Sequence, residues 1–192
     1  RNATLWFNRA KKSRQTLISK NEQIVSLNAE LDYYLALEKS MMDYDDTELK
    51  EVEIELGIGT KKRLQKNQIP TSKPYFVVYK GIKIGFGKNN LQNDHLTFKI
   101  ANKNDTFIHI KGQPGAHMVI FSPEPNMETL SFAAKLGLYL AKIPSATFSF
   151  TKKKYIKKGP FPGSVIFENE QTIFQKADEQ SLNDYIGAIK RF

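Results

Sequence analysis

The first 41 residues carry mostly apolar side chains at alternating intervals of three and four, and no proline or glycine interrupts the pattern. This is the heptad spacing of a coiled-coil helix, in which one apolar stripe packs against another helix. We therefore predict one long helix whose stripe needs a partner, either an upstream segment or a second copy of the chain. The stripe runs through Ala3, Trp6, Ala10, Ser13, Leu17, Lys20, Ile24, Leu27, Leu31, Tyr34, Glu38 and Met41.

A second, shorter helix is predicted over residues 48–56, and Gly57 is placed to end it. Because this helix is too short to cover the whole stripe, the long helix still needs another partner. Together the two helices predict a coiled-coil helical arm over residues 1–60. The side chains suited to cap the start of the short helix are Asp45, Asp46 and Thr47.

The remainder of the chain predicts a linker over residues 61–73 and a second domain over residues 74–192. Short runs of β-branched and aromatic residues predict strands, and the Leu- and Ala-rich run 127–141 predicts a helix that packs on them. A closing helix is expected from Ser181. The expected class is α+β with a mostly antiparallel sheet. The predicted strands cover residues 75–79, 82–86, 106–110, 117–121, 148–150, 164–167 and 172–174.

The net charge of +9 is concentrated in the second domain. Residues 73–192 hold 17 Lys and Arg against 9 Asp and Glu, whereas residues 1–72 hold 12 against 11. A concentrated positive field attracts polyanions, which makes nucleic acid the leading class of partner. The alternative is a lysine-rich surface that serves only solubility.

The glycine-rich segment 85–90 is the first candidate site. Its spacing fits neither a nucleotide-hydrolase phosphate loop nor a dinucleotide-binding fingerprint. A flexible turn is instead suited to bring backbone N–H groups, an ammonium and amides to a phosphate backbone. The alternative is an ordinary turn that caps the helix containing Leu96 and Phe98. The RNA-binding candidates in and just after this segment are Lys88, Asn89, Asn90 and Asn93.

Two histidines flank the second candidate site, a tight turn with glycine and proline. The turn reverses the chain, so the imidazoles of His109 and His117 are expected to lie close together, with Lys111 and Gly115 beside them at a recognition edge. No cysteine or acid accompanies the pair, so no metal site is expected. The alternative is that both histidines are hydrogen-bonded structural residues at strand ends.

Five lysines within the seven residues 152–158 form the third candidate site, which is the most strongly charged. Lysines pair with phosphates and release counterions, while Tyr155 or Phe161 is suited to stack on an unpaired base. The alternative is an edge strand whose lysines prevent aggregation. The RNA-binding candidates here are Lys152, Lys153, Lys154, Tyr155, Lys157 and Lys158.

No residue pattern points to catalysis. The sequence holds no recognisable Ser, His and acid motif, no metalloprotease helix motif and no closely spaced carboxylate pair in the basic domain. We therefore expect a binding protein and not an enzyme, with no cofactor and no metal. The chain has no cysteine and no apolar run long enough to span a bilayer, so the cytoplasm is the expected location.

Taken in order, the motifs of the second domain resemble the RNA-binding domain of the NFACT family. Asp94 joins the RNA-binding candidates through this resemblance. Two positions depart from the family pattern: Phe107 stands where tryptophan is usual, and Gly112 with Gln113 replaces an acidic and apolar pair. The matching segments are 87–94, 96–99, 105–111, 114–117, 155–158 and 162–165, and Asn2, Ala3, Trp6 and Phe7 resemble the start of that family's coiled-coil region.

The NFACT family includes RqcH-type ribosome quality control factors and bacterial proteins called fibronectin-binding. The resemblance implies a factor that binds tRNA and the rRNA and proteins of the large ribosomal subunit at stalled peptidyl-tRNA, and that supports alanine tailing of nascent chains. The family's N-terminal domain is absent from this chain, so the chain alone is not expected to support tailing. Two alternatives are a surface adhesin for fibronectin or heparin-like glycans, and a coiled-coil assembly module.

Overall fold

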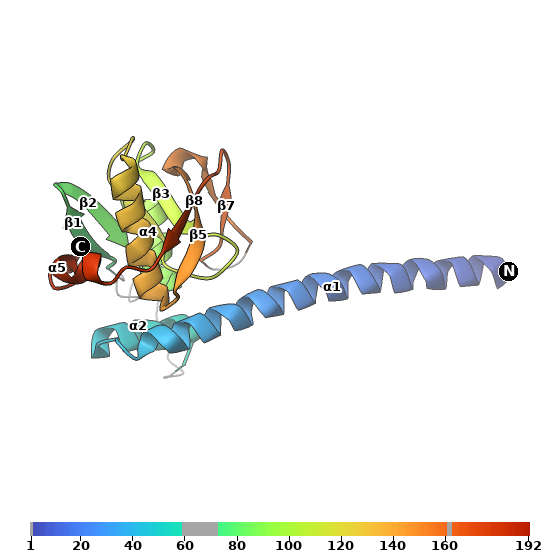
Figure 1. Ribbon diagram of the computed structural model, residues 1–192. Coiled ribbons are helices and arrows are strands. Elements are labelled where there is room, and N and C mark those ends of the chain that lie inside the picture. The colour runs from blue at the N-terminus through green and yellow to red at the C-terminus, as the bar shows by residue number, and fades with distance from the viewer. Residues whose placement is uncertain (1, 59–72, 161–162) are drawn as a thin grey trace.

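The computed structural model describes residues 2–58, 73–160 and 163–192, and a long helical arm projects from a sheet domain (Figure 1). Helix α1 (Asn2–Met41) forms the arm, with the N-terminus at its far tip. The predicted long helix is therefore confirmed. Its apolar stripe is uncovered along most of its length; Leu17, for example, is 62% exposed. The partner for the stripe stays a prediction.

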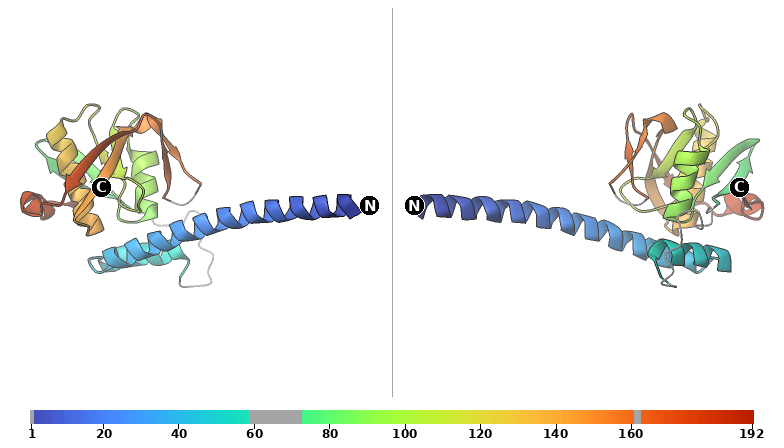
Figure 2. Two further views of the ribbon diagram at one scale, coloured as in Figure 1. Left: turned by 45° about the vertical axis from the view of Figure 1, so that its right-hand side comes forward. Right: turned by 180° about the vertical axis from the view of Figure 1, so that it is seen from behind.

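Helix α2 (Asp46–Leu56) lies alongside the base of α1 and faces the sheet domain (Figures 1 and 2). Asp45 caps it, because its carboxylate accepts hydrogen bonds from the backbone N–H groups of Thr47 and Glu48, both at 2.8 Å. The Glu48 carboxylate accepts in return from the Asp45 N–H at 2.8 Å, which completes a capping box. The predicted short helix is thus confirmed. Of the predicted linker, only Lys73 lies within the described residues.

The core of the second domain is a seven-stranded sheet in the order β8-β5-β3-β4-β2-β1-β9. Every strand pair in it is antiparallel, and so is the separate hairpin of β6 and β7. The α+β class with a mostly antiparallel sheet is therefore confirmed. The strands are β1 (Tyr75–Tyr79), β2 (Ile82–Phe86), β3 (Thr106–Ile110), β4 (Met118–Ile120), β5 (Ser145–Lys152), β6 (Ile156–Lys158), β7 (Val165–Phe167), β8 (Gln171–Lys176) and β9 (Lys190–Arg191).

The seven-stranded sheet separates two apolar clusters. Helix α4 (Met127–Ala141) covers one face, while α3 (Asn90–His95) and the π-helical turn η1 (Leu96–Ile100) cover the other face, as the view from behind shows (Figure 2). Successive side chains alternate between the faces, so that Phe107 joins the cluster under η1 and Ile108 joins the cluster under α4. The loop between β2 and α3, which belongs to the first candidate site, therefore lies with η1 on the face opposite α4.

Parts of the fold were not predicted from the sequence. The short strand β9 carries lysine and arginine without a β-branched run, so nothing local marks it as a strand. Strand β6 lies in the lysine-rich segment 152–158 and agrees with the edge-strand alternative for that segment. The expected closing helix is only the 3₁₀ turn η3 (Gln180–Leu182) followed by the single turn α5 (Asn183–Ile186). Another 3₁₀ turn, η2 (Lys153–Tyr155), interrupts the lysine-rich segment.

No helix within the described ranges is both long enough and apolar enough to cross a bilayer.

Phe148 and Phe174 lie on the neighbouring strands β5 and β8 but differ in burial, since Phe148 is fully buried and Phe174 is 61% exposed. Phe148→Ala should lower the free energy of unfolding by about 3–5 kcal/mol because it leaves a cavity in the core. The matched change Phe174→Ala should cost less than about 1 kcal/mol. Urea unfolding measures both values, and equal losses would contradict this placement of the two strands.

Candidate nucleic-acid interface

Most of the residues predicted to bind RNA lie in or next to two groups. Five of them adjoin these groups without belonging to them: Asp94, His109, Lys152, Lys157 and Lys158. The first group surrounds the loop between β2 and α3, and we call it the motif junction. The second lies around η1 and η2, and we call it the lysine face. Lys111 lies apart from both and forms an ion pair with Glu170 at 2.8 Å. The motif junction comprises Gly87, Lys88, Asn89, Asn90, Asn93, Gly115, His117 and Gly163.

The side chain of Asn93 connects α3 to the loop that holds Gly115 and His117. Its Oδ1 accepts a hydrogen bond from the His117 backbone N–H at 2.9 Å, and its Nδ2 donates to the Gly115 carbonyl at 3.3 Å. Gly87 packs so closely that an added Cβ would lie 2.5 Å from Asn93 Oδ1. Asn93 is only 4% exposed, so its side chain holds the loops together and does not face solvent.

His117 joins the third segment to the motif junction. Its Nε2 lies 2.9 Å from the Gly163 carbonyl, which only accepts, so Nε2 carries the proton. Its Nδ1 then accepts from the Thr97 hydroxyl at 2.9 Å. Both ring nitrogens are satisfied in the neutral form. The histidine is fully buried, in agreement with the structural alternative for this residue.

The two imidazoles lie together, as the turn between them predicts. The rings of His109 and His117 are nearly perpendicular, with centroids 5.3 Å apart. Burial lowers the pKa of His109 to about 4 and the pKa of His117 to about 3, both from an ordinary value of 6.5. Both histidines are therefore neutral at physiological pH. Among the described residues, no group of three or more His, Cys, Asp or Glu is arranged to hold a metal ion.

The asparagines before α3 are largely turned inward. Asn89 is 1% exposed, and its Oδ1 accepts from the Gln92 backbone N–H at 2.8 Å, which caps α3. Asn90 lies against Gly163, where an added Cβ would meet its side chain. Lys88 points to α2, and its Nζ lies 2.7 Å from Glu48. In this conformation the predicted phosphate loop is covered by the arm.

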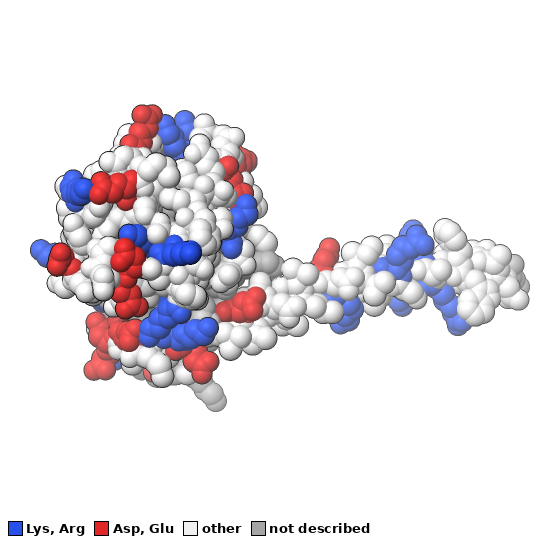
Figure 3. Space-filling model, in the orientation of Figure 1, with Lys and Arg blue, Asp and Glu red and all other residues white. Residues whose placement is uncertain are grey.

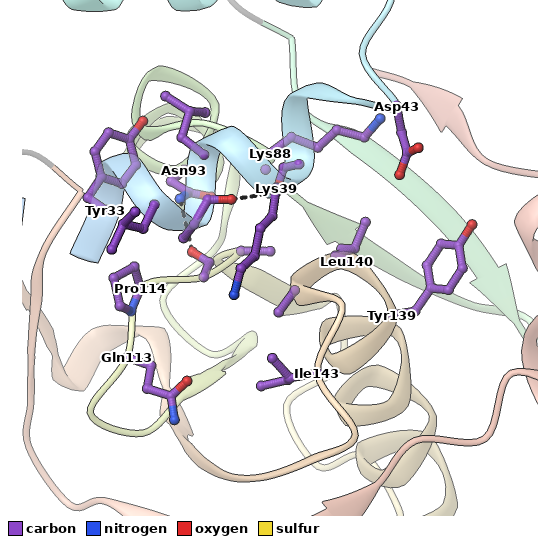
Figure 4. A pocket seen from close by; sticks show the side chains of 18 of the residues that line it. Tyr33, Lys39, Asp43, Lys88, Asn93, Gln113, Pro114, Tyr139, Leu140 and Ile143 are labelled. Carbon is purple, nitrogen blue, oxygen red and sulfur yellow. Dashed lines mark hydrogen bonds between the residues drawn. The ribbon is translucent and has the colours of Figure 1, made fainter. Parts of the chain in front are cut away.

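A cavity of about 610 Å³ opens beside the motif junction, between the base of the arm and the sheet domain (Figure 4). Asn93 and Pro114 line it from the domain, and Leu140 and Ile143 line it from the end of α4. Lys39 reaches in from α1. The arm and the domain therefore share a partly apolar hollow next to the covered loop.

The lysine face is assembled by backbone pairing between two distant segments. The Lys153 N–H donates to the Asp105 carbonyl at 2.8 Å, and the Lys154 N–H donates to the Lys103 carbonyl at 2.9 Å. The turn η2 therefore lies along the loop that follows η1. The lysine face comprises Phe98, Lys99, Lys103, Lys153, Lys154 and Tyr155.

Aromatic rings lie among these lysines. Lys153 Nζ is 5.8 Å from the centre of the Phe98 ring, and Lys154 Nζ is 4.9 Å from the centre of the Tyr155 ring. Both rings are partly exposed. A surface that combines ammonium groups with accessible aromatic rings is suited to phosphates and unpaired bases. Phe161, the other predicted stacking residue, lies outside the described residues.

Ion pairing divides the predicted lysines into two sets. Lys157 pairs with Glu168, Lys158 with Asp94 at 2.5 Å, and Lys152 with Glu124 at 3.7 Å. The other lysines of this surface form no ion pair within the described part of the chain, which leaves their charge available to a ligand. They are Lys99, Lys103, Lys153 and Lys154.

The opposite face of the domain has a different charge pattern. Figure 3 shows basic and acidic side chains interspersed over the face that carries α4, whereas basic side chains predominate along the outer part of the arm. Lysines on the α4 side have acidic partners, such as Lys135 with Asp178 at 2.8 Å. The unpaired positive charge of the domain is therefore better developed around η1 and η2.

Three members of the lysine face were not predicted from the sequence: Phe98, Lys99 and Lys103. They belong to η1 or the loop after it, roughly fifty residues before η2. The segment 96–99 stood out only as part of a possible helix with Leu96 and Phe98 and of a family resemblance, and no periodicity indicated that its lysine faces solvent beside η2. Backbone hydrogen bonds at the end of the β3–β5 pair bring the two segments together.

No protein-family model matches this chain. Among curated proteins, the chain is similar to the Rqc2 homolog RqcH of Bacillus subtilis (strain 168), with 30% identity over 94% of the chain. It is also similar to the Rqc2 homolog RqcH of Streptococcus suis (strain 05ZYH33), with 29% identity over 90% of the chain. The chain spans about a third of these relatives, 34% and 33% of their lengths.

A solved structure shares the arrangement of arm and sheet domain. It is the C-terminal part of the fibronectin/fibrinogen-binding protein from Streptococcus suis, with a TM-score of 0.77 and 26% identity. The similarity covers 96% of this chain and 78% of that chain. Both the helices and the sheet therefore have counterparts in a protein of known structure.

The two buried histidines predict how stability depends on pH. The unfolded chain takes up protons at its histidines as the pH falls through about 6.5, whereas the folded rings stay neutral down to about pH 4 and pH 3. Stability should therefore be fully present above pH 7 and should fall between pH 7 and pH 5, by roughly 3–4 kcal/mol for the two rings together.

Urea unfolding at pH 7 and pH 5 measures this loss. The variant His109→Gln should show a smaller difference between the two pH values, because one of the two titrating rings is gone. Equal stability of the natural chain at both pH values would contradict burial of the neutral rings.

Proposed function

The chain is a relative of the RqcH proteins over nearly its whole length, and on that premise we propose that it is the RNA-binding part of a ribosome quality control factor. Its partners would be tRNA and the rRNA and proteins of the large ribosomal subunit at stalled peptidyl-tRNA. The setting is cytoplasmic and ribosome-associated. The proposal includes the absence of catalysis, of a cofactor and of a metal.

The lysine face is the observation that carries this proposal. Lys99, Lys103, Lys153 and Lys154 have no acidic partner among the described residues, and the rings of Phe98 and Tyr155 lie beside them. Ammonium groups bind the phosphate backbone without regard to sequence, and exposed rings stack on unpaired bases. This combination suits structured RNA with unpaired segments, such as tRNA and rRNA.

The motif junction fixes the position of the lysine face. Asn93 and His117 hold the loops on which α3 and η1 are mounted, and η1 carries Phe98 and Lys99. The buried Asn93 and His117 then act by positioning, while the lysines touch RNA. In the full-length protein this part would hold the factor on the ribosome while the ribosome itself forms the peptide bonds of an alanine tail.

A second candidate function is that of an adhesin. The similar solved structure is a part of a fibronectin/fibrinogen-binding protein, and exposed lysines also suit acidic glycans. Fractionation of cells that express the intact protein separates the two functions. Association with ribosomes supports the quality control function, and a pool found only at the cell surface supports the adhesin.

RNA binding should depend on the lysine face and on salt. The variant Lys99→Ala, Lys103→Ala, Lys153→Ala and Lys154→Ala should weaken tRNA binding by about 100-fold at low salt. The slope of log Kd against log salt concentration should fall by roughly 3, since each neutralised phosphate contributes about 0.7–0.9. Fluorescence anisotropy across a salt series measures both quantities.

A matched variant controls for net charge. It removes the same number of lysines elsewhere, through Lys50→Ala, Lys80→Ala, Lys135→Ala and Lys142→Ala. Three of these four lysines are ion-paired in the structure. Their loss should change the affinity less than about threefold at the same salt concentration. Equal weakening in both variants would mean that the lysine face is not the RNA site.

A further inference from the structure

Three carboxylates on one face of α2 meet the loop before α3. Glu48, Glu51 and Glu55 are spaced by three and four residues, which places them on the same side of the helix. They lie against the segment 88–92, the same segment whose sequence predicts a phosphate-binding loop. Each of the three finds a donor there.

The first two carboxylates are nearly removed from solvent. The Lys88 Nζ lies 2.7 Å from Glu48, whose side chain is 3% exposed. Glu51 accepts from Gln92 Nε2 at 2.7 Å and from Asn89 Nδ2 at 3.2 Å, and its side chain is 8% exposed. Arg191 adds a second cation 3.7 Å from Glu51. The donors around Lys88 therefore form an anion-binding site, and the carboxylates of Glu48 and Glu51 fill it.

The third carboxylate extends the same arrangement. Glu55 accepts from the Asn90 backbone N–H at 3.1 Å and from the Tyr33 hydroxyl. Burial raises the pKa of the Glu55 carboxyl. The Tyr44 hydroxyl donates to the Lys88 carbonyl at 2.7 Å, which steadies the loop from the arm side.

The groups that the domain offers to these carboxylates are all donors: an ammonium, a guanidinium, two side-chain amides and a backbone N–H. The same set of groups contacts phosphate oxygens in complexes of proteins with nucleic acids. A carboxylate and a phosphate both present charged acceptor oxygens, so a row of glutamates on a helix is able to occupy a site suited to a phosphate backbone.

Polar contacts, and not the core, hold α2 against the domain. The two apolar clusters on either side of the sheet contain no residue of α2. Val52 is the one buried apolar side chain of the helix. Removal of α2 from the loop would therefore leave the packing of the sheet domain intact.

The covered loop also adjoins the lysine face. Lys158 Nζ pairs with Asp94 at 2.5 Å, directly after Asn93 in the sequence, and lies 6.0 Å from the centre of the Phe98 ring. A single RNA strand that leaves the lysine face past Lys158 would meet the loop next. Continuity with a surface for RNA favours a phosphate backbone over an acidic protein segment as the alternative occupant.

We propose that the donors around Lys88 form a second site for an RNA phosphate backbone, and that the carboxylates of α2 occupy this site until RNA displaces them. This inference rests on the proposed RNA-binding function. While α2 occupies this site, it competes with RNA and lowers the affinity of the chain for RNA. RNA binding at this site therefore requires α2 to move away from the loop.

The first test neutralises the competitor in the intact chain. The variant Glu48→Gln, Glu51→Gln and Glu55→Gln should bind tRNA about tenfold more tightly, because the loop gains contact with at least one more phosphate. Adding Lys88→Ala to this variant should remove the gain. A control variant loses three exposed acids, two on α1 and one on α2, through Glu22→Gln, Glu38→Gln and Glu53→Gln, and should gain less than about threefold.

The second test follows α2 directly. The chain contains no cysteine, so Lys50→Cys on α2 and Val78→Cys on β1 provide two specific positions for spin labels. Both positions are exposed. The distance between the labels should be narrow without RNA, and should become longer or broader both in the triple Gln variant and in the natural background on addition of tRNA.

The outcomes separate the two proposals. Loss of tRNA binding in the lysine-face variant, together with an unchanged label distance and no gain in the triple Gln variant, would keep the proposed function and overturn the competitor. A gain that persists after Lys88→Ala would also overturn it. Binding of an acidic peptide in place of tRNA to the triple Gln variant would identify a protein ligand and reject the RNA site.

Discussion

The buried amide of Asn93 is the contact on which the organisation of the sheet domain depends. It joins α3 to the turn that holds Gly115 and His117, and His117 in turn binds the Gly163 carbonyl. These hydrogen bonds lie in the interior, where an unpaired donor or acceptor costs about 1–3 kcal/mol. Three segments distant in the sequence are thereby fixed, so the position of η1 on the sheet is fixed as well. The positions of the lysine face and of the loop beside α2 therefore depend on the hydrogen bonds of Asn93.

Much of the fold was predictable because its signals are local. The hairpin of β1 and β2 turns at Gly81, which has a positive φ of 81°, and the run 127–141 shows helical apolar spacing. Asp45 and Gly57 mark the ends of α2 by side-chain and backbone preferences that operate within a few residues. The strand β9 has no such signal, since its pairing partner determines it. Its short basic sequence suits a loop equally well.

The candidate site was only partly predictable for the same reason. The sequence indicates which residues are unusual, but not which way they point. Asn89, Asn93 and His117 stand out by type, yet each is almost completely buried and hydrogen-bonded. Lys99 and Lys103 are ordinary lysines that matter because η2 pairs with the loop beside them. The glutamates of α2 resemble a solvated helix face until the helix is placed against Lys88. Contacts between distant segments, and not residue types, decide these roles.

The most direct test of RNA binding at the lysine face is ultraviolet cross-linking of tRNA to the intact chain, followed by mass spectrometry of the linked peptides. Nucleotides should be attached to peptides that contain Phe98, Lys99, Lys103 or the turn Lys153–Tyr155, and these cross-links should disappear at high salt. Cross-links confined to β8 or to the face covered by α4 would place the RNA elsewhere and contradict the central claim.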